Sequence, residues 1–107
     1  MSAASSSIFG LRLKEARLEA GLSQKQLGID AGLDPFVAST RINRYELGIH
    51  KVDYTFANRL ASALAVPVAF FYADDEDLAR LILIFGRLPK RKRADLLSHA
   101  GAVESAP

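Results

Sequence analysis

Apolar residues recur every three or four positions along most of the chain, which is the spacing of α-helices that bury one side. Runs with the alternating pattern of a β-strand are nearly absent. We expect seven helical segments, over 8–20, 24–31, 35–47, 54–65, 66–72, 74–88 and 89–99. The fifth of them, 66–72, is a brief turn or short helix. The sequence therefore predicts an all-α fold, in which a compact five-helix bundle is followed by a two-helix C-terminal extension.

The predicted helices begin and end at residues with suitable capping chemistry. Serine and aspartate side chains accept hydrogen bonds from the free N–H groups at a helix start. The residues in these positions are Ser7, Ser23, Asp34 and Asp53. The sequence "SQKQ" at 23–26 is a capping box, in which the Gln26 side chain also reaches back to the amide of Ser23. The first three helices are expected to end at Gly21, Gly32 and Gly48.

The same spacing indicates which residues of each helix face the core. In the first helix the inner residues are expected to be Ile8, Leu11, Ala16 and Leu18, and the outer ones Arg12, Lys14, Glu15, Arg17 and Glu19. In the second helix Leu27 and Ala31 point inward, and Gly28 allows a close approach of a neighbouring helix. The core stripe of the fourth helix is Phe56, Leu60 and Leu64.

The composition narrows the classes of function. The 107 residues are the size of one domain and include no cysteine, which excludes disulfides and thiolate zinc sites. The sequence has no phosphate-binding glycine loop, nucleophile elbow or zinc-protease motif, so we expect no catalysis, cofactor or metal. The longest apolar runs, such as 81–85, are too short to cross a membrane, and the N-terminus does not resemble a signal peptide. We therefore expect a cytoplasmic protein.

The third helix carries the strongest functional signal. The net charge is only +2, so a preference for an anionic partner must come from particular positions. Ala38, Ile42 and Tyr45 share the side expected to pack on the second and fourth helices. The other side and its flanks hold no acid and carry Ser39, Thr40, Arg41, Asn43 and Arg44. Arginine pairs with guanine, asparagine pairs with adenine, and hydroxyls contact bases or phosphates, so these five residues are candidates for DNA base contacts.

Two short helices joined by "AGLD" describe a helix-turn-helix, and the motifs around them occur in a specific order. The segments "LRLKEARLEAGLSQKQLGIDAGL", "INRYELG" and "LASALAVPVAFFY" resemble the Cro and phage-repressor-like helix-turn-helix family, often called XRE, over roughly residues 9–72. The resemblance implies a lambda-repressor-like bundle with double-stranded DNA as its partner. It also implies phosphate contacts by Gln24, His50 and Lys51, to which Lys25 and Arg12 add general attraction. Glu46 is expected to be structural and to pair with an arginine such as Arg17 or Arg59.

One segment departs from the family pattern. The stretch from Gly32 to Ile42 is longer by about one helical turn, roughly 6 Å of helix. Either the recognition helix is extended at its N-terminal end, or the turn before it is longer. Both arrangements place Phe36 at the leading edge, where it either contacts a thymine methyl group or folds back onto the protein.

The last third of the chain lies outside this resemblance. Its first helix is apolar nearly all round, which indicates burial on more than one side. Either the final helix, through Leu96 and Leu97, or a second subunit covers the additional side. The candidate contacts with such a partner are Leu78, Leu81, Ile82 and Phe85. The acidic run "DDED" at 74–77 suits the helix dipole, and the basic run "KRKR" at 90–93 is a solvated helix start, a partner for "DDED" or a phosphate contact.

These observations divide the chain into a flexible tail (1–7), a DNA-binding domain (8–73), an extension for packing or dimerisation (74–100) and a second flexible tail (101–107). They predict a transcriptional regulator, a repressor that occupies its operator as a homodimer, because dimers read two half-sites about one DNA turn apart. Two alternatives stay open. One is an antitoxin or other protein-interaction module that binds a protein partner through the C-terminal helices, and the other is an enzyme subunit or scaffold that does not bind DNA.

Overall fold

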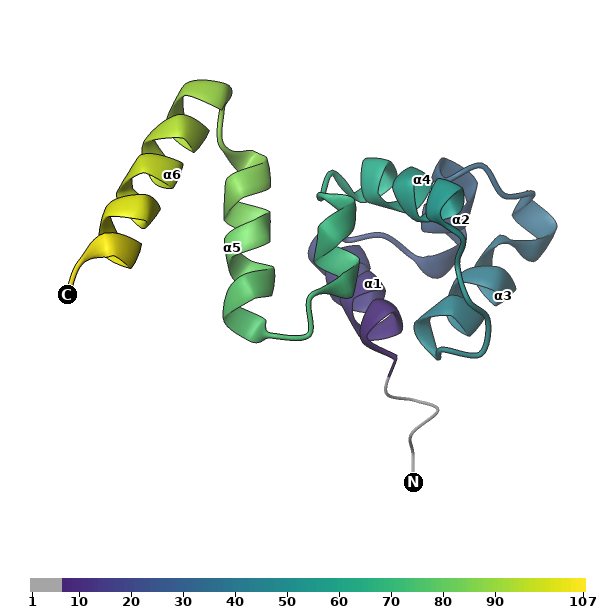
Figure 1. The fold of residues 1–107 in the computed structure, drawn as a ribbon. Coiled ribbons are helices and arrows are strands. Elements are labelled where there is room, and N and C mark those ends of the chain that lie inside the picture. The colour runs from purple at the N-terminus through teal and green to yellow at the C-terminus, as the bar shows by residue number, and fades with distance from the viewer. Residues whose placement is uncertain (1–6) are drawn as a thin grey trace.

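The computed structural model describes residues 7–107, and within that range the chain is helical without any strand (Figure 1). Its elements are α1 (Ile8–Glu19), α2 (Gln24–Asp30), α3 (Pro35–Glu46), α4 (Tyr54–Leu64), the 3₁₀ helix η2 (Val68–Tyr72), α5 (Glu76–Arg87) and α6 (Lys90–Ser105). The first four α-helices begin where the sequence predicts and end one residue earlier. The predicted all-α class is confirmed, with a five-helix bundle from α1 to η2 and an extension of two helices. Apart from Ser7, the predicted N-terminal tail lies outside the described residues.

The helix ends follow the predicted capping chemistry with one exception. Each predicted cap accepts a hydrogen bond from a backbone N–H in the first turn: Ser7 from Gly10 at 3.0 Å, Ser23 from Gln26 at 2.9 Å, and Asp34 and Asp53 from Phe36 and Phe56 at 2.8 Å. The exception is the Gln26 side chain, which donates to Asp30 one turn ahead instead of reaching back to Ser23. Only half of the predicted capping box therefore forms.

The core lies where α1, α2, α3, α4 and η2 meet. Its largest fully buried side chains are Phe71, Leu13, Leu27, Ile42 and Leu60. The packing of α2 on α3 depends on Gly28, since a Cβ there would lie 2.6 Å from the Cβ of Ala38. This close approach was predicted from the sequence, and it lets α3 pack directly on α2.

The prediction for the faces of α1 is right for the buried Ala16 and the exposed Lys14, Glu15 and Glu19, and wrong for four other residues. Leu11 and Leu18, which were expected inside, are 47% and 59% exposed, whereas Arg12 and Arg17 are buried around the fully enclosed Leu13. The two arginines are tolerated there because each guanidinium has a partner, and their aliphatic stems add apolar contact. Arg12 is therefore not available to attract DNA phosphate.

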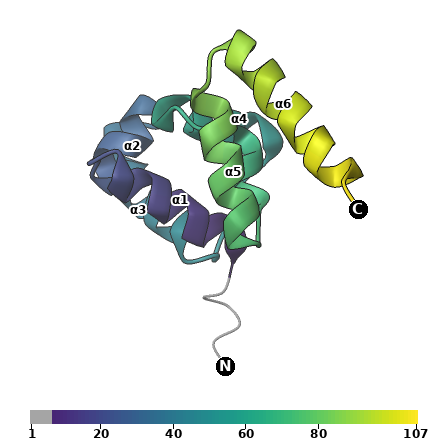
Figure 2. The ribbon, with the colours of Figure 1, turned by 90° about the vertical axis from the view of Figure 1, so that its left-hand side faces the viewer.

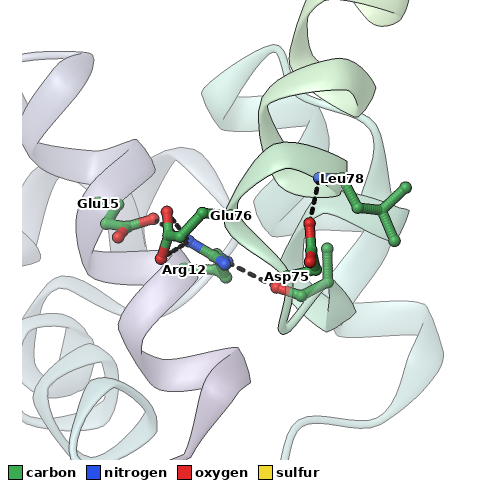
Figure 3. Close-up of polar contacts among 6 residues, drawn as sticks. Arg12, Glu15, Asp75, Glu76 and Leu78 are labelled. Atoms are coloured by element: carbon green, nitrogen blue, oxygen red, sulfur yellow. Dashed lines mark hydrogen bonds and ion pairs between the residues drawn. The ribbon is translucent and has the colours of Figure 1, made fainter.

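Arg12 also connects the bundle to the extension (Figure 3). Its Nε donates to the carbonyl of Ala73 at 2.7 Å, and its Nη1 lies 2.9 Å from Glu15 and 3.3 Å from Glu76. Burial lowers the pKa of the guanidinium, but hydrogen bonds with Glu15 and Glu76 raise it more, so the net shift is upward and the charge is retained. On α5, the helix that carries Glu76, Ala79 is buried against the core. The first half of α5 is thus fastened to the bundle.

The far end of α5 leads through a sharp turn to α6, which points away from the bundle in both views (Figures 1 and 2). Arg93 holds this turn, because it donates to the carbonyls of Phe85 and Gly86 at 3.0 Å and lies 5.1 Å from the Phe85 ring centre. None of the residues of α6 is buried. The prediction that the last helix stops near His99 and that 101–107 frays is wrong, since α6 continues to Ser105.

The predicted pairing of "KRKR" with "DDED" within one chain is also wrong. The two runs lie at opposite ends of α5, separated by the length of a 12-residue helix, about 18 Å (Figure 1). Among residues 7–107, no ion pair joins them. Glu76 is already paired with Arg12. Within residues 7–107, no ion pair engages Asp74 and Asp77 of the acidic run or Lys90, Arg91 and Lys92 of the basic run, so these side chains can meet charges on another molecule.

Candidate nucleic-acid interface

Helix α3 lies at the edge of the bundle, on the side opposite the extension (Figures 1 and 2). Its inner side is the predicted one: Ala38 and Ile42 are fully enclosed, and Tyr45 is 8% exposed with its ring 5.7 Å from that of Phe56 on α4. The outer side is therefore fixed in orientation by the core and is not covered by α5 or α6.

All five residues predicted to contact bases are exposed on α3: Ser39, Thr40, Arg41, Asn43 and Arg44. The only acid within α3 is Glu46, which is buried. The exposed part of this helix thus combines two arginine charges with hydroxyl and amide groups and presents no carboxylate. A surface of this kind is suited to an anionic partner that offers hydrogen-bond donors and acceptors.

Glu46 has the structural role that the sequence predicts, with Arg17 as its partner. Arg17 donates through Nε to Oε2 of Glu46 at 2.6 Å and through Nη2 to Oε1 at 3.2 Å. Both side chains are at least nine-tenths buried, so the pair joins α1 to the end of α3 inside the protein. A Cβ on Gly10 would overlap the carbonyl oxygen of Glu46, which shows how closely the two helices approach.

Gln24 connects this buried pair to the exposed side of α3. Its Nε2 group donates to Oε1 of Glu46 at 3.0 Å and to Oδ1 of Asn43 at 3.1 Å. The Asn43 amide is therefore held in one orientation by a chain of polar contacts that begins at Arg17. Sequence reasoning missed this connection, because the residues of the chain come from α1, α2 and α3.

The other residues predicted to meet phosphate lie around α3. Lys25 is exposed on α2, and His50 and Lys51 are exposed in the loop after α3. Nε2 of His50 lies 3.5 Å from Nη1 of Arg44, which brings the loop beside the last turn of the helix. The arrangement gathers positive and polar groups on both sides of α3, and their contacts with DNA stay a prediction.

The longer segment before Ile42 is accommodated by extending the helix. Asp34 caps α3, and Pro35 begins it, so the additional residues form its first turn. Phe36 is 98% exposed at this tip, and the alternative in which it folds back onto the protein is wrong. Val37 beside it is 40% exposed.

The four apolar residues predicted to contact a partner differ in exposure. Leu78 and Leu81 are each 48% exposed on α5, whereas Ile82 and Phe85 are half-buried. Other exposed apolar side chains of the extension are Ile84, Leu97 and Val103. The final helix was one of two expected covers for this surface, and it leaves these side chains in solvent.

The described residues carry a groove outside α3. This groove of about 1080 Å³ is lined by residues of α1, α5, η2 and the end of α4, and by none of α3. No group of three or more histidine, cysteine, aspartate or glutamate side chains within 7–107 is arranged to hold a metal ion. None of the helices in this range combines the length and the apolar character needed to span a bilayer.

Comparison with known proteins gives solved structures that the chain resembles and a family to which it belongs. The chain is similar to the solved structure titled "Crystal structure of transcriptional regulator BswR", with 41% sequence identity and a TM-score of 0.82. The match covers 87% of this chain and 92% of that chain, so it also takes in part of the extension. No curated protein matches the chain. The family model described as a helix-turn-helix domain matches residues 8–69, more than half of the chain, and the protein belongs to this helix-turn-helix family.

Proposed function

We propose that this protein is a sequence-specific DNA-binding transcriptional regulator of the XRE kind, which places α3 in the major groove and represses by occupying its operator. The observation that carries the proposal is the exposed, acid-free side of α3, on a helix whose opposite side is locked into the core. Membership of the helix-turn-helix family and likeness to a solved transcriptional regulator support it. The role places the protein with the DNA in the cytoplasm and requires neither catalysis nor a cofactor.

Sequence would be read by the side chains on the exposed side of α3. Arg41 and Arg44 carry the planar guanidinium that pairs with O6 and N7 of guanine, and Ser39 and Thr40 contact bases or phosphates. Asn43 is suited to adenine because its Oδ1 has two lone pairs. One accepts from Gln24, and the other is free for the adenine amino group.

Affinity that does not depend on sequence would come from groups beside the helix. Lys25, His50 and Lys51 are exposed and suited to phosphate. Both N–H groups of the Gln24 amide are used within the protein, so a phosphate contact by Gln24 requires that one of them changes partner.

We further propose that the protein acts as a homodimer, formed through the exposed apolar side of α5 and α6. The argument is charge complementarity. In an antiparallel pair of α5 helices related by a two-fold axis, the basic run at 90–93 of each copy meets the acidic run at 74–77 of the other. Leu78 and Leu81 would then be buried between the copies. A different protein on the same surface, as in an antitoxin, is the alternative, and the exposed apolar residues of the extension are what favour it.

Selection of bound duplexes from a random pool tests the DNA-binding function. We expect enrichment of a palindrome, because a two-fold dimer reads two equal half-sites. On that site Arg44→Ala should cost about 1–3 kcal/mol and relax the preference at one base pair. Lys51→Ala should weaken all duplexes similarly and reduce the salt dependence by about one ion. Arg80→Ala, an exposed arginine on α5, is the matched control and should behave as wild type.

The results of the selection test the DNA-binding function, and the two variants test the contacts assigned to Arg44 and Lys51. A pool without any enriched sequence would contradict sequence-specific binding and favour the protein-interaction alternative. If a site is enriched but Arg44→Ala and Lys51→Ala bind it with wild-type affinity and salt slope, the contact assignments are wrong although the function stands.

A further inference from the structure

Phe36 is more exposed than any other large apolar side chain in residues 7–107. At 98% exposure it gains no burial in the folded chain, and Pro35 before it and the exposed Val37 after it leave the tip of α3 apolar. An aromatic side chain in this position contributes little to folding and keeps its apolar surface available for another molecule.

The backbone at this tip is well defined. The N–H of Phe36 donates to Oδ1 of Asp34 at 2.8 Å, and Pro35 occupies the first helical position. Phe36, Thr40 and Arg44 are spaced by four residues, so they follow one another along the outer side of the helix. Two such steps span about 12 Å, which is comparable to three or four base-pair steps at about 3.4 Å each.

We propose that Phe36 is a specificity-determining residue that contacts the 5-methyl group of a thymine, three or four base pairs from the pair read by Arg44. The inference rests on the proposed DNA-binding function and deepens it. The thymine methyl is the one apolar group that a base edge presents in the major groove, and phenylalanine is among the side chains that contact it. An apolar tip on an otherwise polar recognition surface thus matches a groove in which one base carries an apolar group.

The surroundings of Phe36 favour DNA over a protein surface as the occupant. The next exposed residues along α3 are Ser39, Thr40 and Arg41, so an apolar protein partner would have to cover hydroxyls and a guanidinium with the phenyl ring. A thymine lies beside phosphates and base acceptors that satisfy those polar groups. Insertion of the ring between bases is a device of proteins that bind the minor groove, where α3 does not fit.

The experiment uses the operator selected from the random pool, with each thymine of a half-site replaced in turn by deoxyuridine, which lacks only the methyl group. Wild-type protein should lose up to about fourfold in affinity at one position per half-site, the effect of one buried methyl-sized group. Phe36→Ala should bind the thymine operator more weakly and lose this sensitivity at the same position. Leu11→Ala, which trims an exposed apolar residue on α1, is the control and should keep the wild-type pattern.

Phe36→Ala should fold as wild type does, because a side chain that is 98% exposed can be removed without leaving a cavity. Equal melting temperatures of the variant and wild type would show this. The proposal is overturned if no deoxyuridine position distinguishes wild type from Phe36→Ala, or if the variant binds the operator as tightly as wild type. A lower mass of Phe36→Ala in solution also overturns it, because the ring then packs on protein. Enrichment of a site that is sensitive to Arg44→Ala but insensitive to deoxyuridine contradicts only the role of Phe36. A pool without enrichment contradicts the DNA-binding function and this inference together.

Discussion

The buried ion pair between Arg17 and Glu46 should be costly to break from one side. Glu46 is 7% exposed and accepts three hydrogen bonds, two from Arg17 and one from Gln24. In Glu46→Met, a side chain of similar volume replaces the carboxylate, and the Arg17 guanidinium keeps only the carbonyl of Leu22, at 3.0 Å, as a partner. Breaking a buried pair by removing one member costs about 3–5 kcal/mol, because the remaining charge is left in a poorly solvated site.

That cost is large beside the whole stability of such a domain, which is about 5–15 kcal/mol. Urea unfolding followed by circular dichroism measures it, and a loss of about 3 kcal/mol should lower the unfolding midpoint by roughly 1–3 M. Glu19→Met, an exposed glutamate on the same helix as Arg17, is the control and should stay within about 0.5 kcal/mol of wild type.

The double variant Arg17→Met with Glu46→Met decides whether the cost comes from the charge left behind. Removing both charges leaves an apolar pair, so the double variant should be more stable than the sum of the single losses implies, by about 1–3 kcal/mol. A loss for Glu46→Met below about 1 kcal/mol, the range of an exposed ion pair, would refute the reasoning. Additive single losses would refute it as well.

Two further predictions concern the dimer and the backbone. Leu81→Asp places a charge on the proposed contact between copies and should halve the mass measured by light scattering, to the 11.6 kDa of one chain. Leu11→Asp is the control, because Leu11 is 47% exposed and Leu81 48%, and it should leave the mass unchanged. An unaltered mass in Leu81→Asp would assign α5 to contacts within one chain. Ala65 ends α4 with a φ of 56°, a conformation that strains any residue with a Cβ, so Ala65→Gly should stabilise the fold by about 1 kcal/mol in thermal unfolding. A lower melting temperature for Ala65→Gly would show that this turn is not strained.

Much of the fold follows from local signals in the sequence. Caps such as Asp34 and terminal glycines such as Gly32 act within one turn of the chain, and for that reason the boundaries of α1 to α4 could be predicted to within a residue. The faces of α1 could not, because two apolar stripes were available on that helix. The face that carries Leu13 and Ala16 points inward, and Arg12 and Arg17 beside them can be buried because Glu76 on α5 and Glu46 on α3 pair with these arginines. The pairing of Glu46 with Arg17 was among those expected from the sequence, but the partner of Arg12 on α5 is distant in sequence and becomes visible only when the helices are packed.

In the candidate interface, too, some features could be predicted from local sequence and others depend on how the helices pack. The outer side of α3 follows from its 3.6-residue period, and all five predicted base contacts are exposed. The sequence left the orientation of Phe36 open, since an apolar residue at a helix tip fits either a contact with the protein or one with a ligand. The role of Arg93 could not be predicted from the sequence for a different reason. Within a basic run each residue looks like a solvated charge, and only the turn between α5 and α6 selects Arg93 to bind the carbonyls of Phe85 and Gly86.

The position of Glu46 explains how α3 can be held firmly and still present a surface free of negative charge. Fastening α3 to α1 by an ion pair requires an acid on one of the two helices. An exposed acid on α3 would repel DNA phosphate, whereas Glu46 lies on the inner side with its charge neutralised by Arg17. Since Gln24 donates to both Glu46 and Asn43, the same carboxylate also orients a side chain that faces outward. Loss of Glu46 should therefore weaken both the fold and the recognition of the base that Asn43 reads.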